Sequence, residues 1–274
     1  MDSVLNIKLK NNPLVYRDKL TIPRNIKFGL EMELNQVNYS EICSLISKNF
    51  GKDWRVCTDK SLVEGYNAEI VSPVLNNDKK TWVLLRKMGE LLEKVNPSYE
   101  GCSFQVNFDG KLLPTEEDKV RFLKLYAMYE DIIYRFSKGE DSEYRSSLDM
   151  YAHPIILFIK GMNPSIMVDF FSDNKRYGVI FKSEKDLIEF RTPNMTSNPV
   201  LWQNYVTTFY YLLDFATSDK CDIKVLDEYI DKFYKSYVLE DYEREKEDKA
   251  IQFSKKIFYK GVDRINFMHQ YSGK

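Results

Sequence analysis

The chain is poor in the residues on which several common kinds of catalytic site depend. It contains two histidines, His153 and His269, among 274 residues. That number excludes a zinc site built from several histidines, and it argues against a Ser-His-Asp hydrolase. The four cysteines, at positions 43, 57, 102 and 221, form no CxxC pair. Such cysteine usage is typical of a reducing compartment rather than of a secreted, disulfide-bonded domain.

Long apolar runs and an excess of charge of one sign are also missing. Apolar runs such as Ile155–Ile159 are far too short to span a bilayer. Charges occur throughout Met1–Leu20, where a signal peptide would need an apolar core. With 40 basic and 41 acidic residues the formal net charge is −1, so no global basic field attracts nucleic acid. We therefore expect a cytoplasmic protein that binds neither membranes nor nucleic acid.

The sequence does supply material for a packed core. Hydrophobic residues make up 43% of the chain and aromatic residues 14%, which is enough for one or two domains. Apolar periodicity predicts strands and helices without the regular order of a parallel fold, so we predict the α+β class with an antiparallel sheet. The expected strands are 28–34, 54–57, 68–72, 104–108, 177–181 and 187–191, and the expected helices are 41–50, 81–95, 115–137 and 199–216. Ser40 and Asn198 are the expected N-caps of the first and last of these helices.

The C-terminal part of the chain differs from the rest in its charge. From about residue 225 the pattern is helical and increasingly charged, most of all over Glu240–Lys249. Its aromatic residues, among them Phe253, Phe258 and Phe267, indicate that it docks on the rest of the protein. We therefore predict a first domain over residues 1–220 and a helical C-terminal extension over 221–274 packed on it.

Polar residues occupy alternate positions in four of the predicted strands. In a strand, that spacing puts Glu31 and Glu33 on one face while their apolar neighbours face the core. The other three strands would add Glu69, Ser103, Gln105, Asn107, Glu189 and Arg191. If the four strands lie in one sheet, these side chains gather on one face. The alternative is that each strand faces solvent independently, as ordinary amphipathic strands do.

Four carboxylates on one face of a sheet would repel one another unless cations offset them. Mg²⁺ prefers oxygen ligands and is usually held by a few carboxylates together with substrate phosphates. The planar guanidinium of Arg191 suits a carboxylate or a phosphate. The pattern therefore indicates a metal site that handles phosphate, with Glu31, Glu33, Glu69 and Glu189 as its acids.

The order of short motifs along the chain resembles the amidoligase family, which is placed with glutamine synthetase and glutamate–cysteine ligase among the carboxylate–amine ligases. The resemblance covers about residues 26–215 and depends on the order and spacing of the motifs together. The matching segments are Phe28–Glu33, Asp59–Leu62, Glu69–Pro73, Arg145, Arg176–Tyr177, Glu189–Arg191, Thr192–Asn194 and Trp202–Asn204.

This resemblance implies a fold, a cofactor and a set of site residues. The fold would be a curved antiparallel sheet of the glutamine synthetase type, flanked by helices, whose concave face binds ATP and Mg²⁺, with Mn²⁺ as an alternative ion. The implied metal ligands are Glu31, Glu33, Glu69, Gln105 and Glu189. Arg145 and Arg191 would hold phosphate or the substrate carboxylate, with Asn107 beside the cofactor. Asp59 would orient or deprotonate the amine substrate.

The implied reaction joins a carboxylate to an amine. The carboxylate takes the γ-phosphoryl group of ATP to give an acyl phosphate, and the amine then displaces phosphate to form an amide or isopeptide bond. Catalysis of this kind is mainly positioning and charge neutralisation, which metals and arginines supply. An amino acid, a peptide or a protein side chain would serve as substrate. The sequence leaves open whether the chain forms a homo-oligomer.

Several positions depart from the pattern of the family. Gln105 and Asn107 stand where two histidines are expected, Lys60 replaces a glycine, and Phe181 replaces an asparagine. An amide oxygen still ligates Mg²⁺. The departures nevertheless favour an alternative, a binding or regulatory protein that keeps the fold and has lost catalysis. A nucleic-acid-binding module ranks lower, because the net charge is near zero and the strand faces are acidic.

Overall fold

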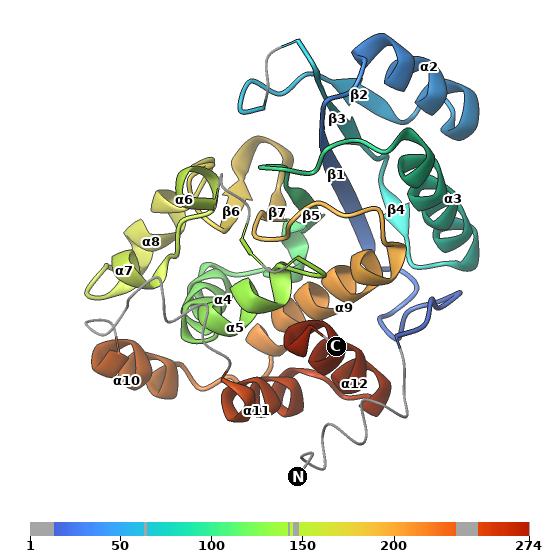
Figure 1. Ribbon diagram of the computed structural model, residues 1–274. Helices are drawn as coiled ribbons and strands as arrows, with labels where there is room; N and C mark the ends of the chain where they lie inside the picture. The colour runs from blue at the N-terminus through green and yellow to red at the C-terminus, as the bar shows by residue number, and fades with distance from the viewer. Residues whose placement is uncertain (1–13, 63–64, 142, 145–147, 234–245, 274) are drawn as a thin grey trace.

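The computed structural model describes residues 14–62, 65–141, 143–144, 148–233 and 246–273. An antiparallel seven-stranded sheet forms the middle of the molecule, with the strand order β2-β3-β1-β5-β7-β6 and with β4 paired to β1 (Figure 1). The strands are β1 (Lys27–Asn35), β2 (Arg55–Cys57), β3 (Asn67–Val71), β4 (Leu75–Asn76), β5 (Phe104–Asp109), β6 (Val179–Lys182) and β7 (Leu187–Phe190). The predicted α+β class with an antiparallel sheet is thus confirmed.

Helices surround this sheet. They are α2 (Tyr39–Phe50), α3 (Lys79–Val95), α4 (Glu116–Met128), α5 (Glu130–Ser137), α6 (Leu148–Tyr151), α7 (Ile156–Ile159), α8 (Pro164–Phe170), α9 (Pro199–Ala216), α10 (Ile223–Phe233), α11 (Glu247–Ile257) and α12 (Gly261–Ser272), with the short 3₁₀ helices η1 (Gly110–Leu112) and η2 (Ser183–Lys185). Within the described part of the chain, no helix combines the length and the apolarity that a membrane crossing requires.

One face of the sheet forms the core. Alternate residues of β1 and β5, such as Met32 and Phe104, are fully buried on this face. Helix α9 packs against it: the ring of Trp202 stacks on Phe104 with centroids 5.5 Å apart. At the next strand, Phe209 stacks on Phe190 at 4.2 Å. Because side chains alternate along a strand, burying these residues turns the polar ones to the opposite face.

Three of the predicted helices differ from the observed ones, and for one of them, α3, the only difference is that it begins at Lys79 rather than at residue 81. The first helix begins at Tyr39 rather than Glu41, and its N-cap is Asn38 instead of Ser40, because the Asn38 side chain accepts the N–H of Glu41 at 3.1 Å. The single helix predicted over 115–137 is broken at Tyr129, which leaves helical geometry with φ −112° and ψ 15°. Asn198 is the N-cap of α9, as predicted.

The C-terminal helices lie beyond α4, α5 and α9, at the bottom of Figure 1. Helix α12 packs on α5 and α9, and α11 packs on α9. At this contact Asn204 donates a hydrogen bond to Gln270 at 3.0 Å, and Gln270 donates to the carbonyl of Phe136 at 3.0 Å. The buried residues of these helices belong to the same hydrophobic cluster as the sheet. Residues 240–245 of the charged run lie outside the described residues.

Candidate functional site

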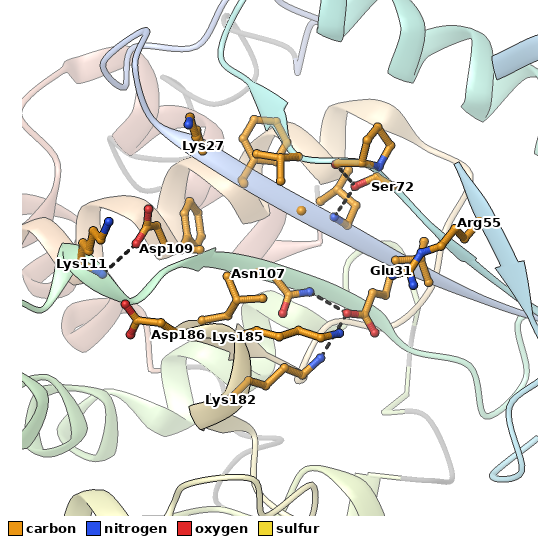
Figure 2. A pocket seen from close by; sticks show the side chains of 18 residues that line it. Lys27, Glu31, Arg55, Ser72, Asn107, Asp109, Lys111, Lys182, Lys185 and Asp186 are labelled. Carbon is orange, nitrogen blue, oxygen red and sulfur yellow. Dashed lines mark hydrogen bonds and ion pairs between the residues drawn. The ribbon is translucent and has the colours of Figure 1, made fainter. Parts of the chain in front are cut away.

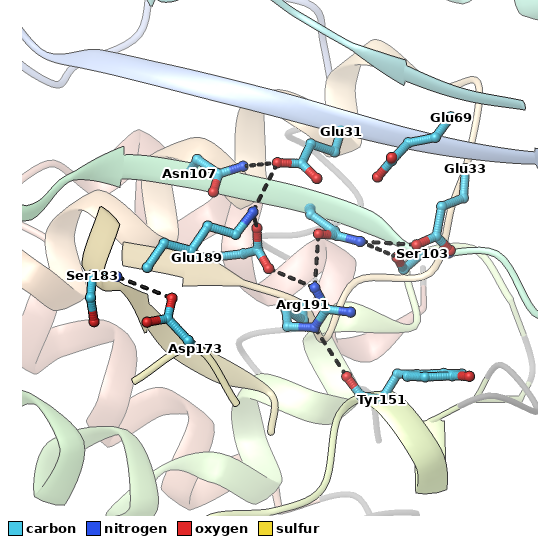
Figure 3. Close-up of polar contacts among 12 residues, drawn as sticks. Glu31, Glu33, Glu69, Ser103, Asn107, Tyr151, Asp173, Ser183, Glu189 and Arg191 are labelled. Carbon is cyan, nitrogen blue, oxygen red and sulfur yellow. Dashed lines mark hydrogen bonds and ion pairs between the residues drawn. The ribbon is translucent and has the colours of Figure 1, made fainter. Parts of the chain in front are cut away.

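The register of the sheet brings the predicted polar residues together. Strand β1 lies between β3 and β5, and β7 follows β5. The facing pairs are Glu33 with Glu69, Glu31 with Gln105, and Asn107 with Glu189. The four strands therefore carry one continuous polar face rather than separate solvated faces (Figure 3).

At one end of this face, Glu189 is enclosed between two cations. Its side chain is completely buried, and Nη1 of Arg191 lies 2.6 Å from its Oε1. Nζ of Lys182 contacts the other oxygen, Oε2, and also lies 3.2 Å from Oε1 of Glu31. Burial works to lower the pKa of Lys182, but Glu189 and Glu31 outweigh it and raise that pKa, so the ammonium stays charged. Lys182 thus bridges carboxylates of β1 and β7.

Glu31 is ionised in this environment. Burial works to raise its pKa, but the Lys182 ammonium and hydrogen bonds with Glu69, Lys182 and Asn107 hold that pKa below the ordinary value. Nδ2 of Asn107 donates to Oε1 of Glu31 at 2.9 Å. The other amide atom of Asn107, Oδ1, is buried and finds no hydrogen-bond partner among the described residues.

A chain of hydrogen bonds runs from Arg191 to Glu33 across β5. Nη1 of Arg191 donates to Oε1 of Gln105 at 3.0 Å, and Nε2 of Gln105 donates to Oε1 of Glu33 at 2.9 Å. The backbone N–H of Ser103 donates to Oε2 of Glu33 at 2.6 Å. Arg191 itself is tied to the carbonyl of Tyr151 at 3.2 Å. The amide oxygen of Gln105, which was expected to ligate a metal, therefore accepts from Arg191 in this structure.

Three carboxylates cluster at the other end of the polar face. One oxygen each of Glu33, Asp59 and Glu69 lies within 4.8 Å of the others. Burial and the nearby charge of Glu31 raise the pKa of Glu69 to about 8. In the metal-free protein Glu69 therefore keeps its proton at neutral pH.

Asp59 is held in its place by the turn that follows β2. Its Oδ1 accepts hydrogen bonds from the backbone N–H and the hydroxyl of Ser61, at 2.6 and 2.5 Å. Its own N–H donates to Oδ1 of Asn67 at 2.9 Å. Asp and Ser in this arrangement form the local turn that their residue types favour. The turn sets the carboxylate of Asp59 beside Glu33 and Glu69.

A cavity of about 590 Å³ opens beside Glu31 (Figure 2). Its charged lining residues are Lys27, Arg55, Lys111, Lys182 and Lys185, with Glu31, Asp109 and Asp186. Val71, Pro73, Val74 and Leu187 give it an apolar part, and Asn107 also lines it. Basic residues outnumber acidic ones, so the cavity suits an anion although the whole chain does not.

The pattern of the sequence missed two residues of this face. Lys182 falls outside the strands expected over 177–181 and 187–191, but it ends β6 and lies two residues after Ile180, which faces Glu189 across the ladder. Cys57 lies opposite Glu69, and its thiol donates a hydrogen bond to Oε2 of Glu69 at 3.3 Å. Burial and the charge of Glu69 raise the pKa of Cys57 to about 11, so the thiol keeps its proton. Because side chains alternate along a strand, Lys182 shares the face of Ile180 and Cys57 shares the face of Arg55, and this spacing is the signal that would have placed Lys182 and Cys57 on the polar face.

Two other expectations concern residues away from this face. Phe181 lies on the core face, where its ring meets Phe122 edge to face at 6.4 Å, so this departure from the family pattern does not change the polar face. Arg145 lies outside the described residues.

Comparison of the chain with models of known protein families gives no match, and a search among curated proteins gives none either.

Proposed function

We propose that the protein is an ATP- and Mg²⁺-dependent carboxylate–amine ligase that forms an amide or isopeptide bond. The observation that carries the proposal is the juxtaposition of an acidic cluster and a basic cavity on one polar sheet face. The motif resemblance adds the reaction class and a sheet of the glutamine synthetase type. Neither an acidic cluster nor a basic cavity by itself would favour a ligase.

The acidic cluster fits Mg²⁺ by its donors and by its charge. Glu33, Asp59 and Glu69 offer carboxylate oxygens, the ligands that this hard cation prefers, and Mn²⁺ accepts the same set. Burial and, after it, the charge of Glu31 raise the pKa of Glu69, and a divalent cation bound to this carboxylate would displace its proton. When bound, the ion would supply charge neutralisation for the phosphates of ATP.

The basic cavity fits a nucleotide. Its volume lies within the range of about 300–1,000 Å³ typical of small-molecule sites. We assign the phosphates to the basic side chains around Arg55 and Lys182, and the base to the apolar lining at Val71 and Pro73. The buried Oδ1 of Asn107 would gain a hydrogen bond from a ligand hydroxyl or amino group, which removes the cost of leaving it unpaired.

In the proposed reaction, an oxygen of the substrate carboxylate attacks the γ-phosphorus and ADP leaves. The amine then attacks the acyl carbon, phosphate leaves, and the amine nitrogen loses a proton. We assign Asp59 to orient the amine, because it is a partly exposed carboxylate at the edge of the cluster, and the proton passes to solvent. Arg191 holds Glu189 and Gln105 in place and keeps the face from accumulating negative charge.

Trapping the activated carboxylate tests this proposal directly. The protein would be incubated with Mg²⁺–ATP, a panel of amino acids and peptides, and hydroxylamine as a general amine. We expect hydroxamate to form together with stoichiometric ADP and phosphate, and we expect Glu69→Gln to abolish it. Glu41→Gln, on the exposed surface of α2, is the matched control and should keep the activity. Hydroxamate formation that does not depend on ATP or on Glu69 would contradict the proposal.

The second candidate, a binding or regulatory protein without catalysis, is favoured by the way Glu189 and Gln105 are engaged. Both are held by Arg191, so their oxygens are occupied by a guanidinium. This reading predicts that Mg²⁺–ATP stabilises the protein, by about 2.7 kcal/mol at a hundred times its Kd, without any release of ADP. A melting-temperature shift without turnover on any carboxylate and amine supports this candidate, and turnover refutes it.

A further inference from the structure

Lys182 occupies the position between Glu31 and Glu189 where carboxylates of two strands converge. We propose that its ammonium takes the place of a divalent cation there, so that the polar face holds one metal ion only, at Glu33, Asp59 and Glu69. The inference rests on the proposed function in so far as the face binds a metal. It adds a specific role for Lys182, namely setting the number of ions.

The contacts of Lys182 are those that a bridging cation would make. Its Nζ contacts Oε2 of Glu189 and lies 3.2 Å from Oε1 of Glu31, although β5 separates the two strands that carry these acids. Its side chain is only 17% exposed, and that of Glu189 is fully buried. Figure 2 shows the Lys182 side chain extending from β6 toward Glu31. A buried carboxylate pair requires such a partner, because isolated buried charges are strongly unfavourable.

The two halves of the polar face offer different surroundings to a divalent cation. In one half, Glu31 and Glu189 carry two negative charges, and Lys182 and Arg191 carry two positive ones. That half is neutral as it stands, so an added divalent ion would have to displace a tethered ammonium. In the other half, three carboxyl groups lie within 4.8 Å of one another and offer oxygen ligands to a single ion. This second half is therefore where we place the ion.

Counting bound Mn²⁺ tests the inference with a readout other than activity. Mn²⁺ alone would be titrated into the full-length protein by calorimetry, and the bound ion would be observed by electron paramagnetic resonance. We expect one Mn²⁺ per wild-type chain, with the spectrum of an isolated ion. In Lys182→Met, which removes the ammonium at similar length, we expect two ions per chain and the broadening that a pair of neighbouring Mn²⁺ ions gives. Lys111→Met is the matched control: Lys111 lines the same cavity beside Asp109, away from Glu31, and should leave one ion (Figure 2).

The outcomes separate this inference from the proposed function. Two ions in the wild-type protein, or a single ion in a folded Lys182→Met variant, would overturn the role of Lys182 and leave the metal site intact. No Mn²⁺ in the wild-type protein would overturn both. If Lys182→Met does not fold, Lys182→Gln, which keeps a polar head without the charge, takes its place and is expected to bind two ions; a single ion in folded Lys182→Gln would overturn the inference.

Discussion

Two glutamates on neighbouring strands of the polar face have opposite protonation behaviour. Burial acts on both, but Lys182 lies beside Glu31 and holds its pKa down, whereas Glu69 faces the charge of Glu31 and has its pKa raised to about 8. The difference therefore comes from the groups beside each carboxylate, and the Lys182 ammonium is the largest of those that lower the pKa of Glu31. At the scale of the residue, charge placement rather than burial decides which carboxylate keeps a proton.

This difference predicts how stability depends on pH in metal-free protein. Folded Glu69 releases its proton near pH 8 and the unfolded chain near 4.5, so the folded state binds the extra proton between these values. The stabilisation is complete below pH 4.5 and is lost as pH rises through 8, with a slope of at most about 1.4 kcal/mol per pH unit. Urea unfolding in the presence of a chelator, from pH 5 to 8, should show this decline. Glu69→Gln should flatten it and Glu41→Gln should not; equal slopes in all three proteins would contradict the assignment.

Most residues of the face were predictable, and the exceptions have a physical reason. The alternation in each strand predicted that Glu31, Gln105 and Glu189 point away from the core, because burial of the intervening apolar residues leaves no other arrangement. The position of Lys182 depended on where β6 ends, and a strand that runs into a polar turn gives no clear boundary. The ion pair between Lys182 and Glu31 joins strands far apart in sequence, which no local pattern encodes.

At the scale of the element, β7 positions charges by means of its core residues. Glu189 and Arg191 point to the polar face, while Phe190 between them stacks on Phe209 of α9 at 4.2 Å. The stacked ring fixes the strand against the helix. The charged neighbours of Phe190 are therefore held by backbone geometry as well as by their own ion pairs.

Removing this ring should weaken the whole fold. Phe190 is fully buried, so Phe190→Ala is expected to lower the free energy of unfolding by about 3–5 kcal/mol, through lost burial and the cavity left behind. Phe158→Ala is the control, because Phe158 is 39% exposed and should cost much less. Denaturant unfolding of both variants measures the difference. Equal losses would show that the stacking of Phe190 on α9 is unimportant.

Helix boundaries were harder to predict than the helices themselves. The apolar stripe over residues 122–136 continues through Tyr129, so the pattern indicated one helix. The structure breaks it there, and the next residue, Glu130, is fully buried and accepts the N–H groups of Ile155 and Ile156 at 2.6 and 3.2 Å. Such a tertiary contact overrides local periodicity, and the sequence around it carries no sign of it.

At the scale of the whole molecule, the C-terminal helices complete the core. Asp263 of α12 is fully buried and lies 2.7 Å from Arg17 near the other end of the described chain. Gln270 of the same helix bonds to α9 and α5. The aromatic residues of this region predicted that it docks on the rest of the protein. The partners could not be predicted, because the hydrogen bonds join residues 66 or more positions apart.

Deletion of residues 247–274 tests this integration. Without α11 and α12, the buried faces of α5 and α9 would be exposed, and Arg17 would lose its carboxylate partner. We expect the shortened chain to lose the single cooperative thermal transition and to aggregate, because large exposed apolar patches promote association. Circular dichroism and size-exclusion chromatography against the full chain measure this. A shortened protein that is monomeric and melts at the same temperature would show that these helices are a separate appendage.

The most direct test of the central claim is a crystal structure of the protein with Mg²⁺ and a non-hydrolysable ATP analogue. The account predicts an ion bound by oxygens of Glu33, Asp59 and Glu69, and phosphates in the cavity beside Arg55 and Lys182. A nucleotide bound elsewhere, or an ion that touches none of these carboxylates, would contradict the claim that the polar face of the sheet is a magnesium–nucleotide site.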